Sequence, residues 1–95
     1  MFGDLVIYRV HALRRMFERA ISEPDIRRVL NSGEEIETYS LDQPYPSRLL
    51  LGFVKTMPIH VVAAYNATDD QTIIVTVYRP DPLRWTADFR TRRCS

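Results

Sequence analysis

Three runs of strand-forming residues, separated by very short connections, restrict the fold of this chain more than any other feature. The runs are rich in β-branched and aromatic side chains, and they span residues 48–55, 58–66 and 72–79. The connections, near residues 56–58 and at 67–71, are too short for a crossover between parallel strands. The sequence therefore predicts consecutive antiparallel hairpins. An alternating run at 35–39 predicts a further strand, so we expect a sheet of three to four strands.

The segment before the strands has the periodicity of an amphipathic helix. Between residues 10 and 21 the apolar side chains recur at helical spacing, so that one stripe faces a core. We expect Leu13 and Phe17 to lie in this stripe and to be buried against the sheet. Three polar side chains fall on another side of the helix, in one row with a spacing of four residues: His11, Arg15 and Arg19.

A second helix is predicted directly after the first. Ser22 offers an N-cap oxygen, and Asp25 three residues later completes a box-like start. Ile26 and Val29 form the stripe that we expect to be buried. Gly33 is expected to end the helix in the left-handed conformation.

These elements predict one α+β domain over residues 1–95, in which two N-terminal helices pack on an antiparallel sheet. The segment 4–8 fits either a short edge strand or an irregular lead-in. After the sheet, residues 82–95 form a polar C-terminal tail. Trp85 and Phe89 are four residues apart in this tail, where they either stack on bases or pin the tail to the domain.

The charges are nearly balanced overall but unevenly distributed. The formal net charge is +1, so the molecule is not the strongly basic body of a typical nonspecific nucleic-acid binder. Residues 31–45 contain four acidic side chains and no basic one, and basic stretches lie on either side. Twelve of the thirteen basic residues are Arg, the side chain suited to bidentate recognition of phosphate and carboxylate. A GC-rich genome would produce the same preference for Arg.

No motif for a metal, a phosphate loop or a nucleophile elbow occurs, so we expect no metal and no cofactor. The acidic residue at position 4 stands where a signal peptide would have positive charges, and the apolar runs are too short to span a membrane. The lone Cys94 excludes an internal disulfide framework. These features predict a cytoplasmic protein that does not contact a membrane.

The row of His11, Arg15 and Arg19 is a candidate binding site for phosphate groups of RNA or for an acidic segment of a partner. Lys55, the only lysine, is assigned to the same binding role. The alternative for the row is a solvated helix face with ordinary ion pairs, because Glu18 lies within helical reach of Arg15.

His60 opens an apolar strand, and an imidazole there can act as a general base near neutral pH. Tyr78 ends the neighbouring strand, and Arg79 follows it. If the register places Tyr78 opposite His60 they share a face, whereas a slip of one residue separates them. In the first case an imidazole, a phenol and a guanidinium converge, a set sufficient for metal-free RNA cleavage by 2′-hydroxyl attack. The alternative for His60 is a buried structural role.

Several segments, taken in their order and spacing, resemble the DUF4258 family: residues 11–21, 25–26, 30–33, 36–39, 58–62 and 74–80, with Trp85. The likeness extends from about residue 11 to residue 85. It implies a compact domain similar to the RelE-like toxins of bacterial toxin–antitoxin pairs, particularly the MqsR-like branch. In that branch Tyr78 matches the tyrosine of the sheet, whereas His60 and Arg79 come from the residue chemistry above.

The resemblance implies a metal-independent endoribonuclease that acts on mRNA, alone or at the ribosome. The implied partner is an antitoxin of the YgiT zinc-finger type, which would cover the basic face and hold the enzyme inactive. The competing expectation is a non-catalytic protein- or RNA-binding module that uses the same Arg surface only for docking.

Overall fold

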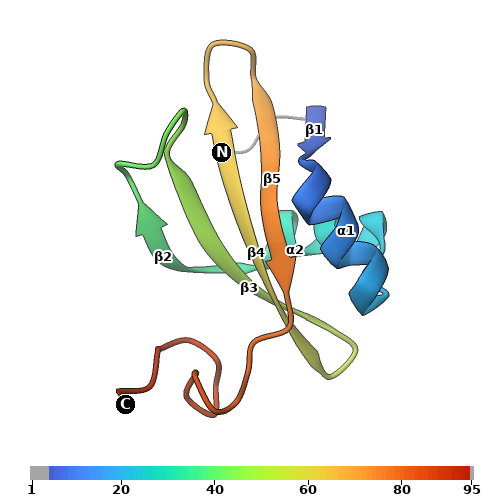
Figure 1. Ribbon diagram of the computed structural model, residues 1–95, viewed down its shortest axis with the longest axis vertical. Coiled ribbons are helices and arrows are strands. Elements are labelled where there is room, and N and C mark those ends of the chain that lie inside the picture. Colours follow the sequence, from blue (N-terminus) through green and yellow to red (C-terminus); the bar gives the residue numbers. More distant parts are fainter. Residues whose placement is uncertain (1–4, 95) are drawn as a thin grey trace.

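The protein is described here by a computed structural model that covers residues 5–94 and contains a five-stranded sheet with two helices (Figure 1). The elements in chain order are β1 (Leu5–Tyr8), α1 (Val10–Arg19), α2 (Glu23–Ser32), β2 (Glu34–Tyr39), β3 (Ser47–Val54), β4 (Met57–Asn66) and β5 (Gln71–Tyr78). The strand order is β1-β5-β4-β3-β2. Neither helix of the described segment is long and apolar enough to cross a membrane.

The prediction of a purely antiparallel sheet of three to four strands under two N-terminal helices is wrong. β1 pairs with β5 in parallel, which makes the sheet mixed and five-stranded, and the helices follow β1 instead of opening the fold. The argument from short connections covers only strands that follow each other closely in the chain. Those pairs, β3–β4 and β4–β5, are antiparallel as predicted. β1 and β5 are joined by the whole intervening chain, which is long enough for a crossover. Of the two possibilities for segment 4–8, the structure has the short edge strand, β1, and position 4 lies outside the described residues.

The helices pack on one face of the sheet, α1 against β5 and α2 against β3. The core between them consists of buried apolar side chains: Ala12, Met16, Ile21, Ile26, Val29, Leu50, Ile59, Val61, Ala63, Ile74 and Val77. The expectation that Leu13 and Phe17 are buried is wrong, because their exposed fractions are 50% and 90%. α1 instead presents the small Ala12 and the flexible Met16 to the sheet, which turns the next position after each toward solvent.

The start of α2 is as predicted, and its end is not. The Ser22 hydroxyl accepts from the backbone N–H of Asp25, and the Asp25 carboxylate accepts from the N–H of Ser22. Gly33 has φ −71°, so it does not adopt the left-handed conformation that was expected. Glycine is needed there for space, because a Cβ would lie 2.5 Å from the carbonyl oxygen of Val29. The left-handed C-cap belongs to α1, where Ala20 has φ 54°.

The opposite face of the sheet is covered in part by the C-terminal segment, residues 81–94. Side chains alternate along β4, so His60 points away from the helices that cover its neighbours Ile59 and Val61. The segment consists of turns and one isolated bridge between Trp85 and Arg92. In Figure 1 it leaves the end of β5 and passes to the side of the sheet where β2 lies.

Candidate functional site

The strand register brings His60 and Tyr78 together. They are direct partners across β4 and β5, the arrangement in which both side chains share a face. The Nδ1 atom of His60 lies 3.2 Å from the Tyr78 hydroxyl, and the Nε2 atom lies 2.9 Å from the carbonyl oxygen of Phe89. A carbonyl only accepts, so Nε2–H donates to Phe89, and Nδ1 of the neutral ring accepts from the Tyr78 O–H. Tyr78, His60 and Phe89 therefore form one directed chain of hydrogen bonds.

His60 is shielded from solvent, with an exposed fraction of 0%. The rings of Trp85 and Tyr78 meet its ring edge to face, at centroid distances of 4.4 Å and 5.2 Å. Burial lowers the pKa of His60 below its ordinary value of 6.5, against an opposing effect of the Phe89 carbonyl. Burial likewise raises the pKa of the Tyr78 hydroxyl. At neutral pH the pair therefore consists of a neutral imidazole and a protonated phenol.

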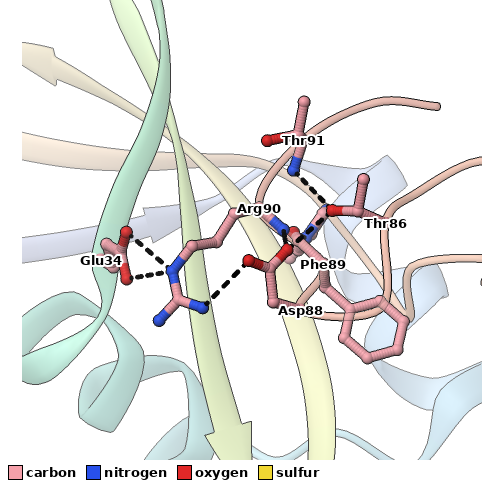
Figure 2. Close-up of polar contacts among 7 residues, drawn as sticks. Glu34, Thr86, Asp88, Phe89, Arg90 and Thr91 are labelled. Atoms are coloured by element: carbon pink, nitrogen blue, oxygen red, sulfur yellow. Dashed lines mark hydrogen bonds and ion pairs between the residues drawn. The ribbon is translucent and has the colours of Figure 1, made fainter. Parts of the chain in front are cut away.

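The C-terminal segment that covers His60 is fastened to β2 by two Arg side chains. Arg90 Nε lies 2.8 Å and 3.0 Å from the carboxylate oxygens of Glu34, and Figure 2 shows this contact together with the turn that holds Arg90. Arg92 donates two hydrogen bonds of 3.0 Å to Glu37, and its guanidinium lies 4.7 Å from the centroid of the Trp85 ring. Two carboxylates of the acidic stretch are thus paired with two arginines of the C-terminal segment.

The backbone of this segment turns sharply at Phe89, the residue whose carbonyl meets His60. Phe89 has φ 61°, in the left-handed region that residues other than glycine rarely adopt. The Asp88 carboxylate holds the turn, because it accepts from the Thr86 hydroxyl and from the backbone N–H of Arg90 (Figure 2). Trp85 is buried, with an exposed fraction of 3%, so it pins the tail to the domain.

A cleft beside this network is lined by the predicted row of α1. His11, Arg15 and Arg19 share a cavity of 570 Å³ with residues from β5 and from the segment after it: Thr76, Tyr78, Asp81 and Arg84. The two sides meet because β1 pairs with β5 only as far as Ile74, and α1 begins directly after β1 and packs beside the rest of β5 (Figure 1). Three guanidinium groups and one carboxylate line this cleft, and Arg15 also forms the exposed ion pair with Glu18 that the alternative for the row predicted, at 3.2 Å. The cleft therefore favours anions.

The family comparison covers most of the chain. A family model described as a domain of unknown function, DUF4258, matches residues 8–79. The chain belongs to the DUF4258 family. No curated protein and no solved structure matches it. The DUF4258 match includes the cleft row of α1 and both His60 and Tyr78, but it ends before Trp85 and the rest of the segment that covers them.

The other predicted site residues of this DUF4258 chain lie outside the cleft lining. Arg79 donates from Nη2 to the carbonyl oxygen of Arg19 at 2.9 Å, so it ties the end of β5 to the end of α1. Lys55 is exposed in the turn between β3 and β4, with φ 58°. The structure therefore brings together His60 with Tyr78 and, separately, Tyr78 with the row of α1. Arg79 reaches only the backbone of Arg19, and neither Arg79 nor Lys55 lines the cleft.

Sequence reasoning missed two kinds of contributors. Asp81 and Arg84 reach the cleft from a segment without periodicity, and nothing in the sequence signalled their direction. The Phe89 carbonyl belongs to the backbone, so its contact with His60 could not be predicted from residue type. Within residues 5–94, no three side chains of His, Cys, Asp or Glu are grouped so that they could hold a metal ion.

Proposed function

We propose that this DUF4258 protein is an endoribonuclease that binds RNA in the cleft between α1 and β5. The observation that supports it best is convergence. Arg15 and Arg19 of α1 meet Arg84 from the segment after β5, and the three line one cavity together with an imidazole and a phenol. Guanidinium groups match phosphate geometry, and their number in one cleft fits the backbone of a nucleic acid better than a single small anion.

The proposed reaction is cleavage by attack of the RNA 2′-hydroxyl on the adjacent phosphorus. Such a reaction needs a group that takes the hydroxyl proton and cations that offset the charge growing on the phosphoryl oxygens. The cleft offers Tyr78 and His11 for proton transfer and three Arg side chains for the charge. Since guanidinium groups fill the electrostatic role, the proposed mechanism is metal-independent.

The second candidate is a non-catalytic module that uses the same cleft to dock RNA or an acidic protein segment. Two of the three side chains first assigned to catalysis favour it. His60 is shielded from solvent, and Arg79 is bonded to the carbonyl of Arg19. The two candidates share the binding surface and differ only in whether bound RNA is cut.

We propose in addition that the protein acts on mRNA as a toxin, alone or at the ribosome, and is held inactive by a YgiT-type zinc-finger antitoxin. The resemblance to RelE-like and MqsR-like toxins supports this cellular role. α1 also carries an exposed apolar stripe on the side of the helix away from the cation row, and such a stripe suits a protein partner: Val10, Leu13 and Phe17.

The test compares two neighbouring arginines of the same helix. Arg15 lines the cleft and Arg14 does not, so Arg15→Ala is the probe and Arg14→Ala the matched control. Binding of single-stranded RNA is followed by fluorescence anisotropy over a series of salt concentrations. We expect Arg15→Ala to weaken binding and to reduce the slope of log K against log salt by roughly 0.7, the value for one phosphate contact on a single strand. Arg14→Ala should stay close to the wild type.

Cleavage is measured on the same RNA in the presence of EDTA. Products with a 2′,3′-cyclic phosphate support the ribonuclease, and binding without cleavage leaves the docking module. Equal RNA binding by the Arg14 and Arg15 variants contradicts the ribonuclease and the RNA-docking module alike. Induction in cells, with and without the adjacent gene, then tests the toxin role through growth and transcript integrity.

A further inference from the structure

We infer that His60 works through Tyr78 as a buried proton acceptor, and that the C-terminal segment builds this relay by fixing the tautomer of His60 with the Phe89 carbonyl. The inference rests on the proposed ribonuclease function. His60 is then a positioning residue that acts through Tyr78. The His60 ring is buried and does not line the cleft, whereas Tyr78 does. Residues beyond the DUF4258 match are then also part of the site.

The relay consists of three parts: a group that is activated, a base that accepts its proton, and an element that orients the base. Tyr78 is the group that faces the cleft, and His60 is the base. The orienting element is a main-chain carbonyl, at 2.9 Å from Nε2. That acceptor holds the proton of the neutral ring on Nε2 and leaves the lone pair of Nδ1 facing the Tyr78 hydroxyl.

Several contacts keep the carbonyl in place. Phe89 adopts a left-handed backbone conformation, which points its carbonyl at the ring, and the Asp88 turn holds that conformation. On one side of Phe89, Arg90 is bound to Glu34 (Figure 2). On the other side, the Trp85 ring packs against His60. An adventitious tail would need neither a strained residue nor paired anchors at this point.

The proposed step conserves atoms and charge. The RNA 2′-oxygen forms a bond to phosphorus while its proton passes to the Tyr78 oxygen, and the proton of Tyr78 passes to Nδ1 of His60. The bond from phosphorus to the 5′-oxygen breaks, which gives a 2′,3′-cyclic phosphate. The imidazolium then returns its proton through Tyr78 to the leaving 5′-oxygen. Tyr78 begins and ends as a neutral phenol.

The charged and titratable groups around His60 come from three elements: Glu37 of β2, Tyr78 of β5 and Arg92 of the C-terminal segment. Glu37 favours the imidazolium and Arg92 opposes it, and these two are paired with each other. Burial therefore dominates and keeps the acceptor neutral at pH values where an exposed histidine is half protonated. The acid limb of the cleavage rate should accordingly lie below pH 6.5, the ordinary pKa of histidine.

The first measurement needs no catalysis. Nitrogen-15 NMR of the full-length protein, with His11→Gln to assign the two histidines, should show His60 as the Nε2–H tautomer at pH 7. Tyr78→Phe should shift the Nδ1 signal, because Nδ1 loses its donor. An Nδ1–H tautomer, an imidazolium at pH 7, or an unchanged Nδ1 signal overturns the relay.

The second measurement is cleavage kinetics. Tyr78→Phe and His60→Gln should each lower kcat by roughly 10²-fold, with RNA binding little changed, and the double variant should lose no more than the worse single variant. Full activity of a folded His60→Gln protein overturns the relay while the ribonuclease stands. A wild-type protein that binds RNA but never cuts it refutes the ribonuclease and the relay's catalytic role together, whatever the NMR shows of the tautomer.

Discussion

Trp85 holds the C-terminal segment on the sheet, so its removal should destabilise the whole domain. The side chain is 97% removed from solvent, contacts His60 edge to face and lies under the guanidinium of Arg92. A polar tail that merely trails along the surface would lose nothing from the change to alanine. A segment that completes the fold loses a large buried aromatic ring and leaves a cavity over His60.

The expected magnitude follows from the burial. Replacing a buried Trp with Ala costs roughly 3–5 kcal/mol in the free energy of unfolding, the sum of lost transfer energy and residual cavity. For a domain of this size, each kcal/mol lowers the melting temperature by roughly 4–8 °C. Trp85→Ala should therefore lower Tm by at least about 12 °C. The edge-to-face contact with His60 contributes to this loss.

The assay is thermal unfolding by circular dichroism, with Leu83→Ala as the control. Leu83 belongs to the same segment and is 84% exposed, so its change should stay within about 0.5 kcal/mol of the wild type. Urea unfolding supplies the free energies. If Trp85→Ala and Leu83→Ala unfold at the same temperature as the wild type, the segment is not part of the folded unit, and the shielding of His60 is not maintained in solution.

Two further predictions concern stability. Gly52→Ala places a Cβ 2.5 Å from Cγ2 of Val29 and should cost roughly 1–3 kcal/mol, whereas the double variant with Val29→Ala should lose less than the sum of the single changes; additive losses in urea unfolding would contradict this close packing. Since burial depresses the pKa of His60, its neutral form stabilises the fold fully above about pH 6.5, and this contribution is lost as the pH falls toward the folded-state pKa. His60→Gln should flatten the dependence of unfolding free energy on pH just below about pH 6.5, and an equal slope in the two proteins would refute the assignment.

The hairpins could be predicted because their connections leave the chain no other choice. The face of α1 that packs on the sheet could not be predicted. Periodicity alone does not tell whether the helix contacts the sheet through Leu13 or through the smaller Ala12. Ala12 permits the closer approach, and the large Phe17 is left in solvent. β1 is only four residues long, and its parallel partner lies at the far end of the chain.

The candidate site was predictable in its chemistry but not in its geometry. The cation row of α1 followed from the spacing of four residues, and the structure places that row in one cleft. The register of His60 against Tyr78 was one of two possibilities that hairpin length does not distinguish. The burial of His60 depends on the C-terminal segment, whose path is set by ion pairs with Glu34 and Glu37 that no local pattern encodes.

The near-neutral charge of the chain is compatible with an RNA-binding cleft because the acidic side chains of β2 are paired with arginines outside it. The three acids of β2 form ion pairs with Arg48, Arg90 and Arg92, and none of these arginines lines the cleft. Three Arg side chains line the cleft, and two carboxylates act against them: Asp81 in the lining, which also accepts a hydrogen bond from the backbone N–H of Leu83, and Glu18, which is paired with Arg15. The net charge of the chain averages over the ion-paired surface at β2 and the cleft between α1 and β5. The local field that a phosphate meets depends on their separation, so the surplus of positive charge is concentrated where Tyr78 is exposed to it.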